Sequence, residues 1–264
     1  MAAETESRLS VLDALLDETE TSDQLAHELF SVVDALDGSA TLRRMLTDPG
    51  TPADARADVV RGLLGGKVSD ACVGLVAEAV RRRWAGGRTL TAALERQAVR
   101  AQLVLADRAG HLDETEDELF RFARFADSDP SLRSALGERS VGLAHRERLV
   151  GELLEDKATL ATVVLAKRAV AARERTFGNT LEGYIKLAAA QKNRVIATVR
   201  VARPLTEEQQ QRLRAGLARQ VGRDVALQVI VEPDLLGGVR VELGTEVIEG
   251  TVSGRLAEAR KLFA

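Results

Sequence analysis

A glycine-rich loop is the first stretch of this sequence that could carry chemistry. It reads GLLGGKVS over residues 62–69. A phosphate-binding loop of the P-loop type would need a glycine where Arg61 stands and a Ser or Thr where Val68 stands, and it would follow a strand. The residues before this loop have helical spacing instead. We therefore interpret the loop as a turn between helices and not as a nucleotide site.

The histidines and the cysteine give no catalytic or metal-binding pattern either. His27, His111 and His145 are far apart in the sequence, without the spacing of metal ligands, which favours surface histidines. Cys72 lies in an apolar helical segment beside Val73, which is typical of a buried structural thiol. No nucleophile, base and orienting group can be assembled. We predict a protein that is not an enzyme and that has no catalytic residues, cofactor or metal.

Composition and charge narrow the possible fold class and the possible partners of the protein. The chain has 264 residues, of which 45% are hydrophobic and only 3% aromatic, so its cores must be built from Leu, Val and Ala, as in packed helices. A net charge of −3 gives the chain no excess of positive charge with which to bind nucleic acid. One Cys excludes an internal disulfide and fits a reducing compartment. The most apolar stretch, 158–172, contains Lys167 and Arg168, so we expect membrane association only through a partner.

Apolar residues at helical spacing predict a long run of helices before residue 193. Leu9, Leu12, Leu15 and Leu16 form the face of the first, and Ser22 or Asp23 begins the second. The predicted helices cover 4–17, 23–36, 42–46, 53–64, 68–84, 90–109, 113–126, 130–136, 144–155, 158–173 and 177–191.

The helical part contains an internal duplication. An ungapped offset, set by Leu42 on Leu132 (132 − 42 = 90), aligns many identical residues. The identical pairs include Leu29–Phe30 with Leu119–Phe120, Leu46 with Leu136, Arg56 with Arg146, Lys67 with Lys157, Leu75 with Leu165, Ala79–Val80 with Ala169–Val170 and Arg83 with Arg173. Helical periodicity could align the leucines by itself, but it would not also align the charged residues. A period this long indicates a duplicated domain.

Two clusters of charge have local explanations. Arg81, Arg82 and Arg83 with Trp84 end a predicted helix, and the acidic run 113–118 begins one. Both placements are favoured by the helix dipole. For the arginines, binding to an acidic partner surface is the alternative.

Strands are predicted only after residue 193. Alternating apolar residues predict strands over 195–201, 225–231 and 239–243, and Val247–Ile248 restart the pattern after Gly244 as a short hairpin. Between the first two, Thr206 and Gln209 form a capping box for a helix that ends at Gly222. A last helix should follow Ser253. The predicted fold class is α+β: two tandem all-α helical bundles followed by a small α/β C-terminal domain.

The C-terminal stretch also carries a family signature. An apolar residue precedes a double glycine, then alternating strand residues, a glycine, an apolar pair, an acidic residue with glycine, and Arg-Leu. The residues in these positions are Gly237, Gly238, Val239, Val241, Gly244, Val247, Ile248, Gly250, Arg255 and Leu256. This pattern resembles the delta subunit of F-type ATP synthases, the bacterial counterpart of the mitochondrial oligomycin-sensitivity-conferring protein. Glu249 and Thr251 stand where Asp and Ser are commoner in the family.

The resemblance implies a non-catalytic stator role. In the family, the subunit ties the top of the catalytic head to the peripheral stalk, so the expected partners are N-terminal segments of the alpha subunits and the b-type stalk subunits. The expected location is the cytoplasmic face of the bacterial plasma membrane, as a peripheral part of the complex. An all-helical RNA-binding or transcription-accessory module is the alternative, although the sequence has neither a basic face nor stacking aromatics.

The resemblance also implies where a partner would dock. In the family, alpha segments bind a groove between the first and fifth helices of a six-helix bundle. Mapped onto this sequence, the groove would be lined by Leu103, Val104, Leu160, Val164 and Val170, although for any single one of these a place in the bundle core is the favoured interpretation. The duplication allows a second groove in the first bundle, between the helices at 8–16 and 68–80.

The second copy has only five helices of its own. We infer that the helix at 90–109 supplies its missing first helix, so that one rod serves both bundles. The predicted domains are a first bundle over 1–109, a second over 110–193 that shares the helix 90–109, and the α/β domain over 194–264.

Overall fold

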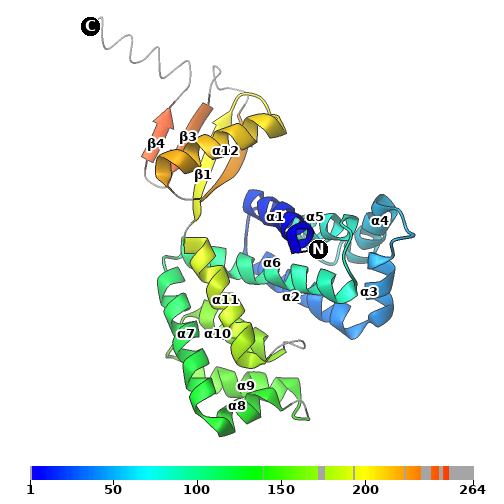
Figure 1. Cartoon of the computed structure of the whole chain (residues 1–264), viewed down its shortest axis with the longest axis vertical. Helices are drawn as coiled ribbons and strands as arrows, with labels where there is room; N and C mark the ends of the chain where they lie inside the picture. Colours follow the sequence, from blue (N-terminus) through cyan, green and yellow to red (C-terminus); the bar gives the residue numbers. More distant parts are fainter. Residues whose placement is uncertain are drawn as a thin grey trace, which may run out of the picture. The chain divides into compact units, whose positions relative to one another are not determined.

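The computed structural model describes residues 2–138, 140–171, 176–192, 194–222, 224–232, 239–243 and 246–249. Within these ranges the chain forms twelve helices and four strands (Figure 1): α1 (Ala2–Glu18), α2 (Asp23–Gly38), α3 (Ala40–Thr47), α4 (Ala53–Leu64), α5 (Asp70–Arg81), α6 (Gly87–Arg108), α7 (Leu112–Ser128), α8 (Pro130–Gly137), α9 (Leu143–Leu154), α10 (Leu160–Ala171), α11 (Phe177–Lys192), β1 (Arg194–Val201), α12 (Glu207–Val221), β2 (Asp224–Val231), β3 (Val239–Leu243) and β4 (Glu246–Glu249). The α+β class predicted from the sequence is confirmed. The helix predicted after Ser253 lies outside the described residues.

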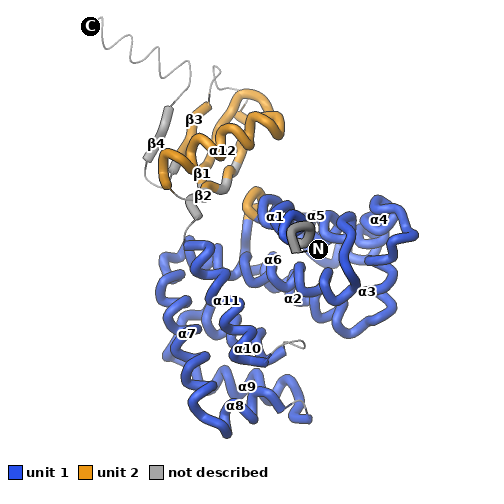
Figure 2. Tube along the Cα trace, in the orientation of Figure 1, with its two compact units in different colours: residues 1–16, 21–192 blue, residues 17–20, 193–264 orange. Residues whose placement is uncertain are grey.

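Contacts divide the chain into two compact units (Figure 2). Unit 1 contains residues 1–16 and 21–192, and all of its described elements are helices. Unit 2 contains residues 17–20 and 193–264, including all four described strands. Each unit has its own hydrophobic core.

Unit 2 is a small sheet covered by a helix. The strand order is β2-β1-β3-β4, with β1 parallel to β2 and antiparallel to β3, and with β3 antiparallel to β4. The helix α12 connects the parallel pair and lies across the sheet in Figure 1. The capping box of Thr206 with Gln209 is present, and Gly222 ends α12 in the left-handed conformation at φ 68°. Side chains of the strands and of α12 together form the core of this unit, which comprises Ala197, Val199, Val201, Leu217, Val225, Leu227 and Val241.

The helix α6 is the central element of unit 1. It packs against α2, α3 and α5, and also against α7, α10 and α11. Figure 1 shows α6 running from a first group of helices, which contains α2, α3 and α5, to a second group, which contains α7, α10 and α11. Eight consecutive residues, Gln97–Val104, are buried. A surface helix buries only one stripe, so a run of this length means that α6 is covered on all sides here.

Polar side chains within this buried run attach α1 to α6. Asp13 of α1 accepts hydrogen bonds from Arg96 Nη2 at 2.9 Å and Gln97 Nε2 at 2.8 Å, and it pairs with Arg100 at 3.0 Å. Burial alone would raise the pKa of Asp13, but the bond from Arg96 and the charges of Arg100 and Arg96 lower it below its usual value. Asp13 is therefore held ionised, as a buried carboxylate must be when its partners are cations.

The duplication is visible in backbone geometry. Gly66, in the turn before α5, has φ 71°, and Asp156, in the turn before α10, has φ 56°. The two positions are 90 residues apart (156 − 66 = 90), the offset found in the sequence. Asp156 is the one described non-glycine residue with positive φ, and Asp tolerates this conformation better than most residues. Both bundles thus enter the equivalent helix through the same left-handed turn.

Arg168 of α10 joins the two groups of helices. It is only 9% exposed, and its guanidinium pairs with Glu95 of α6 at 3.1 Å and Asp34 of α2 at 2.6 Å. The guanidinium carbon lies 5.1 Å from the ring centre of Phe30, a cation–π distance. Tyr184 of α11 donates to the same Glu95 at 3.0 Å. Burial alone would lower the pKa of Arg168, but Glu95 and Asp34 raise it.

These contacts predict that the two groups of helices are rigidly joined through α6, so that the amide hydrogens of α6 are protected from exchange with solvent along its buried part. Because Gln97–Val104 is buried on all sides, we expect continuous protection across Ala98–Gln102, with no hinge there. Hydrogen exchange followed by mass spectrometry on the whole chain measures this. A gap in protection near Ala98–Gln102 would show that α6 is jointed.

The Asp13 cluster gives a pH-dependent prediction. In Asp13→Asn, Arg100 loses its buried counter-ion, and the free energy of unfolding should fall by about 3 kcal/mol at pH 7. Because folding lowers the pKa of Asp13, its contribution is present above the unfolded pKa of about 3.9 and is lost as pH falls through the lower folded pKa. Urea unfolding at pH 7 and pH 3 should therefore show a smaller difference between the proteins at pH 3. Asp58→Asn, which breaks the exposed pair with Arg61, is the control and should cost less than about 1 kcal/mol. An equal loss in both variants would contradict the role of Asp13.

Candidate functional site

The groups that could carry chemistry are placed as the sequence predicted. Cys72 is buried, and burial together with the nearby charge of Glu28 raises the pKa of its thiol to about 12, so it is no nucleophile at neutral pH. His27, His111 and His145 are all exposed. The glycine-rich loop is the left-handed turn between α4 and α5. Among the described residues, no cluster of His, Cys, Asp and Glu is suited to holding a metal ion.

Three of the five residues predicted to line a groove are core residues. Leu103 is 0% exposed, Val104 is 4% exposed and Val170 is 3% exposed. The two α6 residues lie in the run that is covered on all sides, and Val170 belongs to the core cluster of unit 1. These three are therefore buried in this chain, as the alternative of a place in the bundle core expects, and their role in a groove stays a prediction. Apolar helical spacing alone does not distinguish a core side chain from a docking side chain.

The other two predicted residues, Leu160 and Val164, lie on one face of α10 that is not fully buried. Leu160 is 72% exposed, the highest value among the exposed large hydrophobic residues of the described chain. Val163, Val164 and Lys167 follow it and are partly buried. Their positions correspond to i, i+3, i+4 and i+7, which is one face of a helix. We refer to these four residues as the stripe Leu160–Val163–Val164–Lys167, of which Leu160 is the exposed member.

The first bundle does not have the same stripe. At the offset of 90, the positions of Leu160, Val164 and Lys167 are held by Asp70, Gly74 and Ala77 of α5. Two of the three apolar anchors in the second bundle are thus replaced by a carboxylate and by a residue without a side chain. This apolar stripe is therefore particular to the second bundle.

The N-terminal end of α10 is fixed by a buried glutamate. Glu118 of α7 is 8% exposed, and one of its carboxylate oxygens accepts from Thr159 N at 2.8 Å, Thr159 Oγ1 at 3.0 Å and Thr162 Oγ1 at 2.7 Å. The carboxylate thus satisfies free donors at the start of the helix and is favoured there by the helix dipole. It positions the first turn of α10, which carries Leu160.

The first bundle contains the same device. Glu28 of α2 accepts from Ser69 N at 3.0 Å and from Ser69 Oγ at 2.5 Å. Burial alone would raise the pKa of Glu28, but the bonds from Ser69 and Gln24 lower it. Sequence reasoning missed both glutamates because a glutamate in a helix is usually a solvent-facing charge. The offset would have found them, since Glu28 and Glu118 are also 90 residues apart (118 − 28 = 90).

Arginines fix the other ends of the equivalent helices. Arg146 of α9 donates to Val170 O of α10 at 3.0 Å and to Leu136 O at 3.2 Å. Arg56 of α4 donates to Val80 O of α5 at 2.8 Å. Each guanidinium satisfies carbonyls that the last helical turn leaves free. The stripe on α10 is therefore held at both ends by charged groups from neighbouring helices.

The signature residues are described only in part. Val239 and Val241 lie on β3, where Val241 is 4% exposed and pairs with Val199 of β1 and Ile248 of β4. Val247 lies on β4 opposite Glu242. The remaining signature residues, Gly237, Gly238, Gly244, Gly250, Arg255 and Leu256, lie outside the described residues.

No described helix is long and apolar enough to cross a membrane.

Comparison with known proteins agrees with the signature. The family model described as "ATP synthase delta (OSCP) subunit" matches residues 96–263, and the match begins within α6. The chain is 44% identical to the ATP synthase subunit delta of Streptomyces avermitilis over 96% of this chain and 93% of the relative. It is 44% identical to that of Beutenbergia cavernae over 93% of this chain and 91% of the relative. It is 43% identical to that of Kineococcus radiotolerans over 96% of this chain and 93% of the relative. The chain belongs to the ATP synthase delta (OSCP) subunit family.

Proposed function

We propose that this ATP synthase subunit is a stator link between the catalytic head and the peripheral stalk, and that it resists rotor torque without catalysing a reaction. The observation that carries the proposal is the stripe Leu160–Val163–Val164–Lys167, in which Leu160 is 72% exposed and the other three are partly buried, on a helix held at both ends. Membership of the family supports a place in the complex and replaces the alternative of an RNA-binding module.

The stripe suits a helical partner. An amphipathic helix binds through apolar residues at i, i+3, i+4 and i+7, which is also the spacing of the stripe. The occupant we propose is an N-terminal segment of an alpha subunit. Lys167 at the end of the stripe would pair with an acidic residue of that segment. The first bundle, with Asp70 and Gly74 at the equivalent positions, would not bind the same segment in the same way.

The two ends of the chain would serve different partners. Residues 194–264 would hold the b-type stalk subunits, which bring the subunit to the cytoplasmic face of the plasma membrane. The helical bundles would hold the head. We propose functional boundaries at residues 109 and 193, with α6 shared between the bundles.

Rigidity is what this role requires. Several weak contacts on one rigid body dissociate far more slowly than any one of them, because each bound contact keeps the others at high effective concentration. The pairing of Arg168 with Asp34 and Glu95 supports such a body, since it connects α10 with α2 and α6.

Substitution of the exposed leucine tests the docking proposal. In Leu160→Asp, a carboxylate would enter the apolar contact, and we expect the affinity for a synthetic alpha N-terminal peptide to fall about tenfold or more. Leu143→Asp is the matched control, because Leu143 is an exposed leucine of the same bundle, on α9, and the affinity of this variant should be unchanged. Isothermal titration calorimetry on the whole chain gives both values.

Equal affinity of Leu160→Asp and the unchanged protein would contradict the proposal. Point substitutions are preferable to deletion of residues 1–109, because that deletion removes α6 and with it the surface against which α7, α10 and α11 pack.

A further inference from the structure

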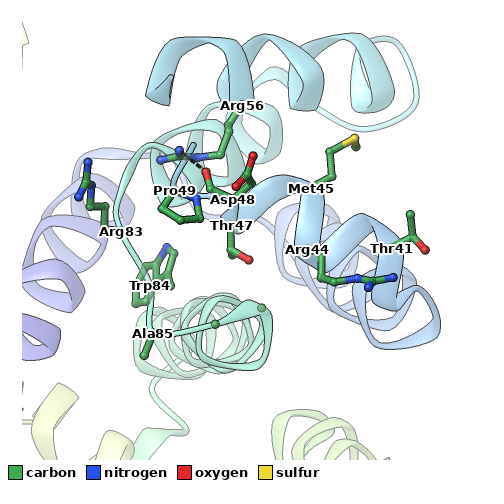
Figure 3. Close-up of a pocket in the computed structure, with 12 residues that line it drawn as sticks. Thr41, Arg44, Met45, Thr47, Asp48, Pro49, Arg56, Arg83, Trp84 and Ala85 are labelled. Atoms are coloured by element: carbon green, nitrogen blue, oxygen red, sulfur yellow. Dashed lines mark hydrogen bonds between the residues drawn. The ribbon is translucent and has the colours of Figure 1, made fainter. Parts of the chain in front are cut away.

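A surface cavity of 760 Å³ lies in the first bundle, away from α10 (Figure 3). Its walls come from α3, from the loop between α3 and α4, and from the loop between α5 and α6. A smaller hollow of 210 Å³ shares Pro49, Arg56 and Arg83 with it, so the two lie next to each other.

Two arginines at this cavity have no acidic partner. Among the described residues, no ion pair or hydrogen bond engages the guanidinium of Arg44 or Arg83, and both are exposed. Their neighbours differ, because Arg81 pairs with Asp54 and Glu78, and Arg82 pairs with Glu78. In Figure 3, Arg83 and Arg44 lie on either side of Trp84 and Pro49 in this view, and the side chain of Arg44 extends toward Thr41.

The other charged groups at the cavity are already satisfied. Arg56 donates to the carbonyls of Val80, Asp48, Thr51 and Arg81 and has a structural role. Asp48 accepts from Thr51 Oγ1 at 2.7 Å and Gly50 N at 3.1 Å, bonds that lower its pKa. The described lining therefore carries two arginines without an ion pair and one exposed carboxylate, Asp48, whose hydrogen-bond donors are neutral.

The cavity also has an apolar part. Met45 is 43% exposed at its wall. Trp84 is 9% exposed, and its indole is fixed because Nε1 donates to Ala79 O at 2.7 Å. A ligand that fits must therefore combine negative charge with an apolar group.

Comparison of the two bundles shows which residues at this cavity also occur at the equivalent positions of the second bundle. Arg56, which caps α5, has its equivalent in Arg146, which caps α10. Arg44 and Met45, in contrast, are replaced by Ser134 and Ala135 at the offset of 90. Arg44 and Met45 are therefore particular to the first bundle, whereas the position of Arg83 is also an arginine, Arg173, in the second.

We infer that this cavity binds an acidic segment of another subunit of the complex, with carboxylates on Arg44 and Arg83 and an apolar side chain between them against Met45 and Trp84. Cations separated by an apolar wall suit a chain with acidic residues on either side of an apolar one better than they suit a single phosphate group. This inference rests on membership of the complex, but not on the proposed role of α10.

Trp84 provides a local signal for the test, since it is the one tryptophan of the 264-residue sequence. The whole chain is titrated with overlapping short peptides that cover the soluble parts of the other subunits of the same ATP synthase, with tryptophan fluorescence and calorimetry as readouts. We expect a peptide with acidic and apolar residues to bind, to change the emission of Trp84 and to bind more weakly as salt is added. Arg44→Gln and Arg83→Gln should each weaken binding roughly threefold to fivefold.

Two controls make the outcomes distinct. Arg121→Gln removes an exposed arginine on α7 and should leave the peptide's affinity unchanged. Leu160→Asp should also leave it unchanged, so failure of the α10 proposal is separable from failure of this one. Absence of binding by every peptide would overturn the inference, as would binding that is insensitive to both arginine substitutions. Binding of inorganic phosphate or ATP at Arg44 and Arg83, with no peptide bound, would also overturn it, because the ligand would then be a small anion and not a protein segment.

Discussion

Complete burial of one helix is the constraint on which unit 1 depends. Between Gln97 and Val104 the helix α6 has no solvent-facing side, so every polar side chain there needs a partner from another helix. Asp13 is that partner for Gln97 and Arg100, and it ties α1 to the same rod. Helices from both sides of α6 in the sequence pack against it, namely α2, α3 and α5 as well as α7, α10 and α11.

The duplication shows which residues the fold requires and which it leaves free to change. Both bundles keep a glutamate at the start of the equivalent helix, an arginine at its end and a left-handed turn before it. The surfaces differ in charge and in apolar character. Glu78 of α5 pairs with Arg81 and Arg82, whereas Arg168, 90 residues later, binds acidic groups of α2 and α6. A single framework thus carries two different surfaces.

Much of the fold could be predicted from the sequence because its signals are local. Helical periodicity, the Ser22 cap, the Thr206–Gln209 box and the alternation in the strands each depend on a few neighbouring residues, and all are present. The burial of the residues predicted to line a groove could not be read from the sequence. Leu160 is exposed, but Leu103, Val104 and Val170 are core residues, because burial depends on which helices meet and not on spacing. Glu28 and Glu118 were missed for the same reason, since the partners that they bind, Ser69 and Thr159, each lie 41 residues further along the chain.

The buried thiol of Cys72 has a practical consequence for work on this subunit. It is the one cysteine of the sequence, it is fully enclosed between helices, and its high pKa keeps it protonated at neutral pH. A cysteine introduced on the surface would therefore react with maleimide dyes or spin labels while the native thiol stays silent. Distances between two such labels, one in each bundle, can be measured in the assembled ATP synthase complex without first replacing Cys72 in the core.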